Sequence, residues 1–253
     1  GGAIYIEDYA EQIKIRDNQI EQAQTYNGDL IAGETACVAI IGISAYRSQL
    51  NEITGNNINN FGKVDYCIRL EYCDQTGVSS NNLGARTAVG FETDHLLIKN
   101  TCRNTRVYRD NVFNSIDTAT DTTPRVSDSG VGTCGLMRAI TSFSNGWTES
   151  NPSAFGVYVY KDPSSDLITL MGLIGGGTTT PGTLMLTVPS GYTPRTWPSE
   201  NTNCRFSVVG RTALSANVAT YVTMLHDGGL QANDVDVSVY LDGISYVGDS
   251  VFD

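Results

Sequence analysis

The chain has 253 residues, of which 40% are hydrophobic and only 17% are charged, and its formal net charge is −11. This negative charge argues against nucleic acid or an anionic membrane as a partner, because both attract clustered lysine and arginine side chains. The longest apolar run, residues 167–174, is far shorter than the ~20 residues that cross a bilayer as a helix. We therefore expect a folded, acidic protein without membrane insertion.

The first 33 residues have the composition and spacing of a helix. They are rich in Glu, Gln, Lys and Ala, and apolar residues recur at intervals of three, four and seven positions, interrupted by Arg16. Such spacing is typical of a coiled-coil seam. We predict an N-terminal helix in residues 1–33 that forms a short parallel trimeric coiled coil and attaches the chain to its assembly. A helix lying on its own domain is the alternative. The seam residues would be Ile6, Tyr9, Ile13 and Ile20.

Residues 34–133 have the pattern of a β-rich middle domain. Residues 36–45 are apolar and β-branched, and residues 63–72 alternate between apolar and polar side chains, as a half-buried strand does. The Asn- and Gly-rich stretch 54–62 between them predicts an exposed loop. A polar, low-complexity stretch at 117–132 predicts a linker or long loop, so we place a domain boundary near Thr133.

Residues 134–253 consist almost wholly of predicted strands and turns. Apolar runs at 155–160 and 167–171 flank a turn and predict a hairpin, and further strands are expected at 183–189, 204–209, 219–225 and 235–241. Strands at this spacing without helices between them indicate a β-sandwich or barrel. The fold class is therefore mainly β, with an N-terminal helix followed by two β domains.

The chain contains little that indicates catalysis or metal binding. It has two histidines, His95 and His226, neither beside a cysteine, and it lacks a Cys-x-x-Cys pair, a nucleophile elbow and a phosphate-binding loop. We expect no catalytic residues, no metal and no cofactor. Buried free thiols are the preferred interpretation of the cysteines, and disulfides the alternative. The six cysteines are Cys37, Cys67, Cys73, Cys102, Cys134 and Cys204.

Aromatic side chains are the remaining candidates for ligand binding. Trp147 follows a turn, Trp197 lies in a proline-flanked segment, and Tyr192 lies between Pro189 and Pro194. A ring face can stack on the apolar face of a sugar, so Trp147 and Trp197, followed by Tyr192, are the candidate glycan-binding or receptor-binding residues. The competing interpretation places these rings in the core or between subunits.

A series of turn motifs in the last 110 or so residues follows a characteristic order. The motifs are Asn145-Gly146-Trp147, Gly176-Gly177-Thr178, Leu186-Thr187-Val188-Pro189, Gly191-Tyr192-Thr193-Pro194, Asp227-Gly228-Gly229 and Leu241-Asp242-Gly243-Ile244-Ser245-Tyr246. This succession resembles the C-terminal β-sandwich of tailed-phage fibre and baseplate proteins of the receptor-binding type. Two positions depart from that pattern: Thr193 stands where the family usually has Arg, and Val188 where Leu is common.

The resemblance implies a non-enzymatic virion protein of the tail, baseplate or capsid, assembled in the host cytoplasm. It further implies a homotrimer that contacts other virion proteins through its N-terminal part and attaches to a host-surface glycan through its C-terminal domain. A glycan-degrading tail depolymerase is the main alternative, although such enzymes need a carboxylate cluster in a groove. A bacterial carbohydrate-binding lectin is a third possibility, disfavoured because the first residues lack the pattern of an export signal.

Overall fold

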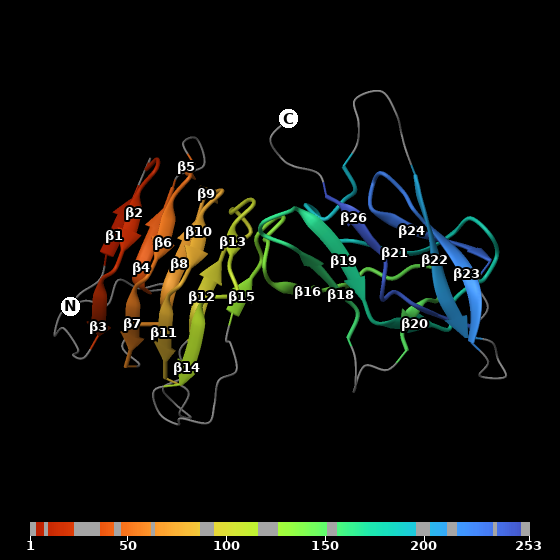
Figure 1. The fold of residues 1–253 in the computed structure, drawn as a ribbon, viewed down its shortest axis with the longest axis horizontal. Coiled ribbons are helices and arrows are strands. Elements are labelled where there is room, and N and C mark those ends of the chain that lie inside the picture. The colour runs from red at the N-terminus through yellow and green to blue at the C-terminus, as the bar shows by residue number, and fades with distance from the viewer. Residues whose placement is uncertain are drawn as a thin grey trace. The chain divides into compact units, whose positions relative to one another are not determined.

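The computed structural model describes residues 4–7, 10–22, 36–42, 47–61, 64–86, 94–115, 126–150, 156–195, 203–211, 217–234 and 237–248. All regular elements in these ranges are strands, many of them labelled in Figure 1. The chain divides into two compact units, Gly1–Thr133 and Cys134–Asp253. The expectation of a mainly β chain is confirmed. In the described ranges we find no helix long and apolar enough to cross a membrane.

The first unit is a β-solenoid, in which each strand pairs in parallel with a strand of the next coil of chain. One sheet has the order β1 (Ile4–Glu7), β4 (Ala36–Ile41), β8 (Tyr66–Glu71), β12 (Asp94–Ile98), β15 (Val126–Asp128). The second has the order β2 (Lys14–Arg16), β6 (Glu52–Thr54), β10 (Gly77–Ser79), β13 (Arg106–Val107). The third has the order β3 (Gln19–Gln22), β7 (Asn57–Asn60), β11 (Asn82–Ala85), β14 (Val112–Ser115), and β5 (Ser48–Gln49) pairs with β9 (Cys73–Asp74).

A column of asparagines at the corner between the second and third sheets connects successive coils. The backbone N–H of Asn18 donates to Oδ1 of Asn56 at 3.0 Å, and that of Asn56 to Oδ1 of Asn81 at 3.0 Å. The backbone N–H of Asn81 donates in turn to Oδ1 of Asn111 at 3.1 Å. These side chains satisfy backbone groups at the point where the chain leaves one sheet for the next, so the corner can be buried.

Backbone conformation repeats at the same corner. The residue before the asparagine has a positive φ at Asp17 (55°), Gly55 (68°) and Ser80 (54°). At Gly55 a Cβ would also meet Oδ1 of the exposed Asp17 side chain, which would have to move. Glycine, and the short polar residues that tolerate this region best, therefore let a very short strand turn sharply at three of the four corners.

The N-terminal segment belongs to this solenoid, so the predicted helix and its coiled coil are wrong. Ile15 is buried between the exposed Lys14 and Arg16 and pairs in register with Ile53. Ile20 is only 4% exposed and pairs with Ile58, so it lies in the core of its own chain and not at a seam between chains.

The other three seam residues do not form a stripe either. Ile6 is partly buried in β1 and pairs with Ile40, Ile13 is partly buried before β2, and Tyr9 lies outside the described residues. The predicted loop at 54–62 is also wrong, because β7 lies within it and buries Ile58 and Asn60. Parallel pairing with the next coil satisfies the backbone groups that a helix would have satisfied internally.

The second unit consists of two antiparallel sheets. One has the order β16 (Met137–Ala139), β18 (Tyr158–Lys161), β19 (Leu167–Met171), β26 (Ser245–Val247). The other has the order β17 (Thr148–Glu149), β20 (Leu173–Gly175), β25 (Ser238–Tyr240), β22 (Cys204–Arg211), β23 (Asn217–Met224), β24 (Gly229–Asp234), β21 (Thr183–Thr187).

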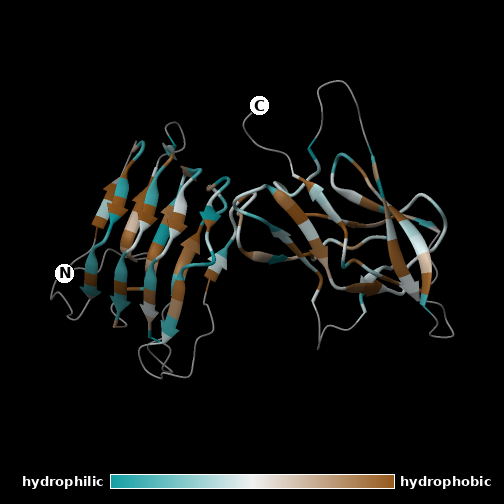
Figure 2. Cartoon of the chain, in the orientation of Figure 1, coloured by the Kyte–Doolittle hydropathy of each residue, from teal (hydrophilic) through white to brown (hydrophobic). Residues whose placement is uncertain are grey.

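A single buried cluster joins the two sheets into a sandwich. It contains Val159 and Leu170 from the first sheet and Val222 and Val239 from the second. In Figure 2, hydrophobic and hydrophilic residues alternate along strands, as expected where one face of a sheet is buried.

The turn motifs of the second unit contact one another in pairs. The indole Nε1 of Trp147 donates to the carbonyl of Thr178 at 3.1 Å, and the N–H of Thr178 donates to the carbonyl of Asn145 at 3.0 Å. The N–H of Val188 donates to the carbonyl of Gly228 at 3.0 Å.

A third pair of motifs is joined by two tyrosines. The hydroxyl of Tyr246 donates to the carbonyl of Tyr192 at 2.8 Å. The six motifs of the series therefore form three interlocked pairs around the sandwich core.

Candidate functional site

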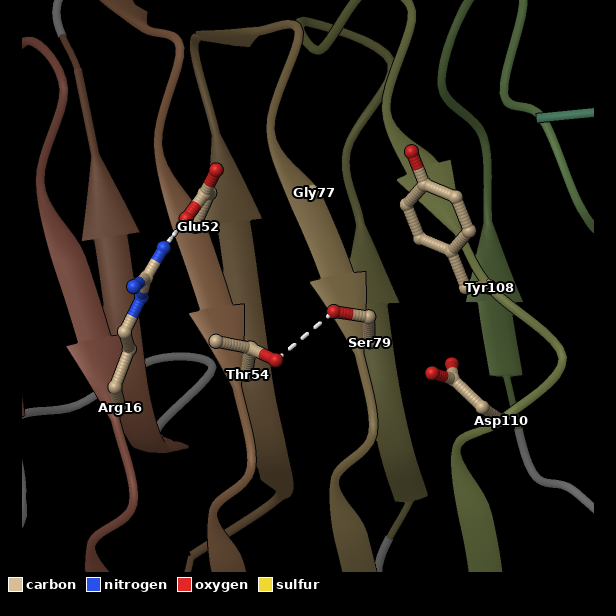
Figure 3. A pocket seen from close by; sticks show the side chains of 7 residues that line it. All are labelled: Arg16, Glu52, Thr54, Gly77, Ser79, Tyr108 and Asp110. Atoms are coloured by element: carbon tan, nitrogen blue, oxygen red, sulfur yellow. Dashed lines mark hydrogen bonds and ion pairs between the residues drawn. The ribbon is translucent and has the colours of Figure 1, made fainter. Parts of the chain in front are cut away.

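A polar groove lies on the sheet formed by β2, β6, β10 and β13 of the solenoid (Figure 3). The parallel register places residues of successive coils side by side, so Arg16, Thr54 and Ser79 form one column. Lys14, Glu52 and Gly77 form the next column along the same strands. The groove has a volume of about 410 Å³ and is lined by Arg16, Glu52, Thr54, Gly77, Ser79, Tyr108 and Asp110.

Gly77 leaves the floor of the groove open. It lies between Glu52 and the side of the groove formed by Tyr108 and Asp110 in Figure 3. A Cβ at this position would have one neighbour within 4 Å, the carbonyl oxygen of Asn51 at 3.9 Å. The depression therefore results from a missing side chain in an otherwise occupied column.

Basic side chains hold the carboxylate on one side of the groove. The guanidinium of Arg16 forms a hydrogen-bonded ion pair with Glu52, and Nζ of Lys14 lies 3.9 Å from Oε2 of Glu52. The hydrogen bond from Arg16, supported by the charge of Lys14, lowers the pKa of Glu52. Glu52 is therefore ionised at neutral pH and its charge is largely balanced.

The opposite side of the groove carries a carboxylate with a hydroxyl partner. Oγ of Ser80 donates to Oδ2 of Asp110 at 2.6 Å, and this hydrogen bond lowers the pKa of Asp110. Between the two sides, Oγ of Ser79 donates to Oγ1 of Thr54 at 3.0 Å. The groove thus presents ionised oxygens, hydroxyls and the ring of Tyr108 to solvent.

The solenoid ladder also holds Tyr108 in place. Its backbone N–H donates to the carbonyl of Val78 at 2.9 Å, and its own carbonyl accepts from Nδ2 of Asn111 at 2.6 Å. Asn111 belongs to the buried asparagine column, so the column that connects the coils also positions a ring at the edge of the groove.

The aromatic residues singled out from the sequence lie elsewhere. Trp147 is 1% exposed and Tyr192 is 0% exposed, and both belong to the core of the second unit. Neither ring can stack on a sugar without rearrangement, because no face is open to solvent. Trp197 lies outside the described residues. Neither Trp147 nor Tyr192 lines the groove.

The cysteines have no disulfide partner in the structure. None of the six forms a disulfide, five of them are buried, and Cys204 is partly exposed. Burial raises the pKa of the Cys37 thiol to about 12. The described residues contain no cluster of three or more His, Cys, Asp or Glu that could hold a metal ion.

The groove was not among the sites predicted from the sequence. Its lining residues come from four coils and are polar residues of ordinary type. The signal that could have found it is the repeated pattern apolar-x-x-Asn-x-apolar, at Ile15–Ile20, Ile53–Ile58 and Val78–Leu83. This pattern aligns the coils and places Arg16, Thr54 and Ser79 at the same position of the repeat.

Comparisons with protein families, curated proteins and solved structures give a weak structural match. No protein-family model matches the chain. No curated protein matches it either. Among solved structures, the receptor binding protein (gp15) of Listeria phage PSA matches at 22% sequence identity with a TM-score of 0.34. The alignment covers 44% of this chain and 63% of that chain, and at this TM-score it carries no argument about fold or function.

Proposed function

We propose that this chain is a non-enzymatic structural protein of a bacteriophage virion that takes part in attachment to the host surface. The observation that carries the proposal is the pairing of the turn motifs in the second unit. The motifs that resemble those of fibre and baseplate proteins contact one another: Trp147 with Thr178, Val188 with Gly228, and Tyr246 with Tyr192. They act together as one scaffold, which is the role that the resemblance assigns to them.

The groove carboxylates are the feature that would favour a depolymerase instead. A glycosidase uses two carboxyl groups, and one of them must hold a proton that it donates to the leaving group. Both Glu52 and Asp110 have lowered pKa values, so both are ionised at neutral pH. Two ionised carboxylates can accept hydrogen bonds from a glycan but provide no proton donor, which favours binding over hydrolysis.

The proposal includes a homotrimer, with its interfaces in the β units. Light scattering on the purified chain is expected to give three times the chain mass of 27.2 kDa. A monomer mass at micromolar concentration would contradict the trimer and leave the attachment role to be tested separately.

Gold-labelled antibodies against the chain test the proposed function on particles of the phage that encodes it. We expect labels on intact virions at the tail, baseplate or capsid. Labels confined to lysed host cells and absent from purified particles would overturn the proposal. In parallel, host polysaccharide is incubated with the chain, and steady release of reducing sugar would establish the depolymerase instead.

A further inference from the structure

We infer that the groove on β2, β6, β10 and β13 binds an uncharged saccharide chain. The inference deepens the proposed function, on which it rests, because it names the surface and the ligand class of attachment. It also moves the candidate site from the second unit, where Trp147 and Tyr192 are buried, to the solenoid.

The shape of the groove suits an extended ligand. The lining residues come from three adjacent parallel strands, β2, β6 and β10, and from the turn after β13, and such strands are spaced by about 4.8 Å in a sheet. A linear chain can therefore lie across the strands and meet side chains from each coil in turn. Gly77 provides the depth, since the outward position that it occupies carries no side chain.

The polar groups match the hydroxyls of a sugar. Asp110 has a carboxylate with one oxygen bonded to Ser80, and an ionised carboxylate accepts strong hydrogen bonds from hydroxyl donors. The hydroxyls of Thr54 and Ser79 can both donate and accept, as the hydroxyls of a sugar can. Sugars are recognised by several such groups arranged around one cavity.

The ring of Tyr108 supplies the apolar contact. It stands at the edge of the groove in Figure 3, on the same side as Asp110. A sugar ring has an apolar face of C–H groups, and an aromatic ring offers a matching flat surface with a polar tip. The groove therefore combines a stacking surface with hydrogen-bonding groups, which the buried rings of the second unit cannot do.

The charges favour an uncharged ligand over an acidic one. The lining residues contain two carboxylates, Glu52 and Asp110, and one guanidinium, that of Arg16, which is paired with Glu52. The whole chain also carries a net charge of −11. Asp110 and the overall field would repel an anionic glycan more than a neutral one, although Arg106, which is in register with Gly77, places one further cation beside the groove.

Filling the groove at Gly77 tests the inference with little disturbance of the fold. A Cβ at this residue would meet one atom within 4 Å, and the residue lies in a strand, where a β-branched side chain is favoured. Gly77→Ile should therefore fold, with adjustment of the side chains of Glu52 and Arg106, its partners in register. Ser127→Ile is the matched control, because Ser127 is exposed in β15 and does not line the groove. Asp110→Asn is a second variant that removes a charge from an exposed residue and cannot fail through overpacking.

Binding of the full chain is measured on an array of neutral and acidic oligosaccharides and on neutral polysaccharide extracted from the host cell wall. We expect the wild type and Ser127→Ile to bind at least one neutral glycan, and Gly77→Ile and Asp110→Asn to bind it about tenfold or more weakly. Circular dichroism and the melting temperature should match for all four proteins.

Three results would overturn the inference: binding to no neutral glycan, binding to acidic glycans alone, or undiminished binding by both groove variants. If Gly77→Ile fails to fold, Asp110→Asn alone decides between weakened and undiminished binding. The outcome is separable from the proposed function. If the chain is present on virions but binds no neutral glycan, the inference about the groove is wrong and the proposed virion role is retained. If the chain binds a neutral glycan but is absent from virions, the proposed virion role is wrong and the inference about the groove is retained.

Discussion

Replacement of Asn81 by alanine measures how much the buried asparagine column stabilises the solenoid. Oδ1 of Asn81 accepts from the backbone N–H of Asn56 at 3.0 Å and from its Nδ2 at 2.9 Å. Nδ2 of Asn81 donates to the carbonyl of Ile53 at 2.8 Å and to Oδ1 of Asn111 at 3.0 Å. Asn81 is only 1% exposed, so water cannot replace these partners without opening the corner.

The expected loss follows from the groups left without a partner. The N–H of Asn56 loses its acceptor, and an unsatisfied buried donor costs about 1–3 kcal/mol. The two bonds from Nδ2 of Asn81 each contribute a further ~0.5–1.5 kcal/mol. The side chain of Asn56 keeps its bonds to Ile15 and Thr54. We therefore expect Asn81→Ala to lower the free energy of unfolding of the first unit by roughly 2–6 kcal/mol.

The neighbouring Asn82 provides the control. It is exposed, and its side chain bonds to Asn57 and Asn114, which are side chains on the outer face of the same sheet. Exposed polar contacts of this kind contribute little, so Asn82→Ala should cost less than about 1 kcal/mol.

Urea titration followed by two probes separates the units. Far-UV circular dichroism reports on both units, whereas tryptophan fluorescence reports only on residues after 133, because the chain has two tryptophans, Trp147 and Trp197. Asn81→Ala should lower the urea midpoint of the circular dichroism transition that belongs to the first unit. The midpoint measured by tryptophan fluorescence should stay unchanged. Equal losses for Asn81→Ala and Asn82→Ala, or a loss below about 1 kcal/mol for Asn81→Ala, would refute the reasoning.

Three further predictions concern the second unit, the groove and the thiols. Gly177→Ala should destabilise the second unit by more than about 2 kcal/mol in urea titration, because its Cβ would lie 2.1 Å from Cγ of the buried Trp147 ring; an unchanged midpoint would contradict that packing. Arg16→Gln should raise the pKa of Glu52 toward its ordinary value in an NMR titration, and an unmoved pKa would contradict the ion pair. Because the pKa of Glu52 is lowered in the folded state, the stability that Arg16 contributes, less than about 1 kcal/mol, should be present at neutral pH and vanish as the pH falls through that pKa. Thiol reagent should react readily with Cys204 alone in the native protein and with all six thiols in denaturant, and rapid reaction of several native thiols would contradict their burial.

The strands of the second unit could be predicted because their pairing is local and antiparallel. The expected hairpin at 155–160 and 167–171 corresponds to β18 and β19, which pair directly with each other. The expected strands at 204–209 and 219–225 correspond to β22 and β23, which also pair directly. Short turns join neighbours in such a sheet, so alternation and turn residues carry most of the information.

The solenoid could not be predicted in the same way, because its pairing joins residues of different coils. Successive members of the asparagine column are 38, 25 and 30 positions apart, so no constant period marks them. The short strands offer few alternating residues, and corners with positive φ at residues such as Gln12 and Asp17 break the local pattern. Apolar residues at three- and four-residue spacing in the first 22 positions therefore resembled a helix.

The groove was hidden for the same reason. Arg16, Glu52, Ser79 and Asp110 become neighbours only when the register of four coils is known. The burial of Trp147 likewise depends on the loop at Gly177 and Thr178. Thr178 is 31 residues away in the sequence, and the loop becomes a neighbour of Trp147 only when β17 pairs with β20. Neither fact follows from the residue types alone.

Competition for adsorption tests the proposed role in attachment most directly. Host cells are incubated with increasing concentrations of the purified full chain and then with particles of the phage that encodes it, and the fraction of unadsorbed particles is counted. The account predicts that this fraction rises with the concentration of wild-type chain until adsorption is blocked. Adsorption that stays unchanged at every concentration of the folded chain would contradict it.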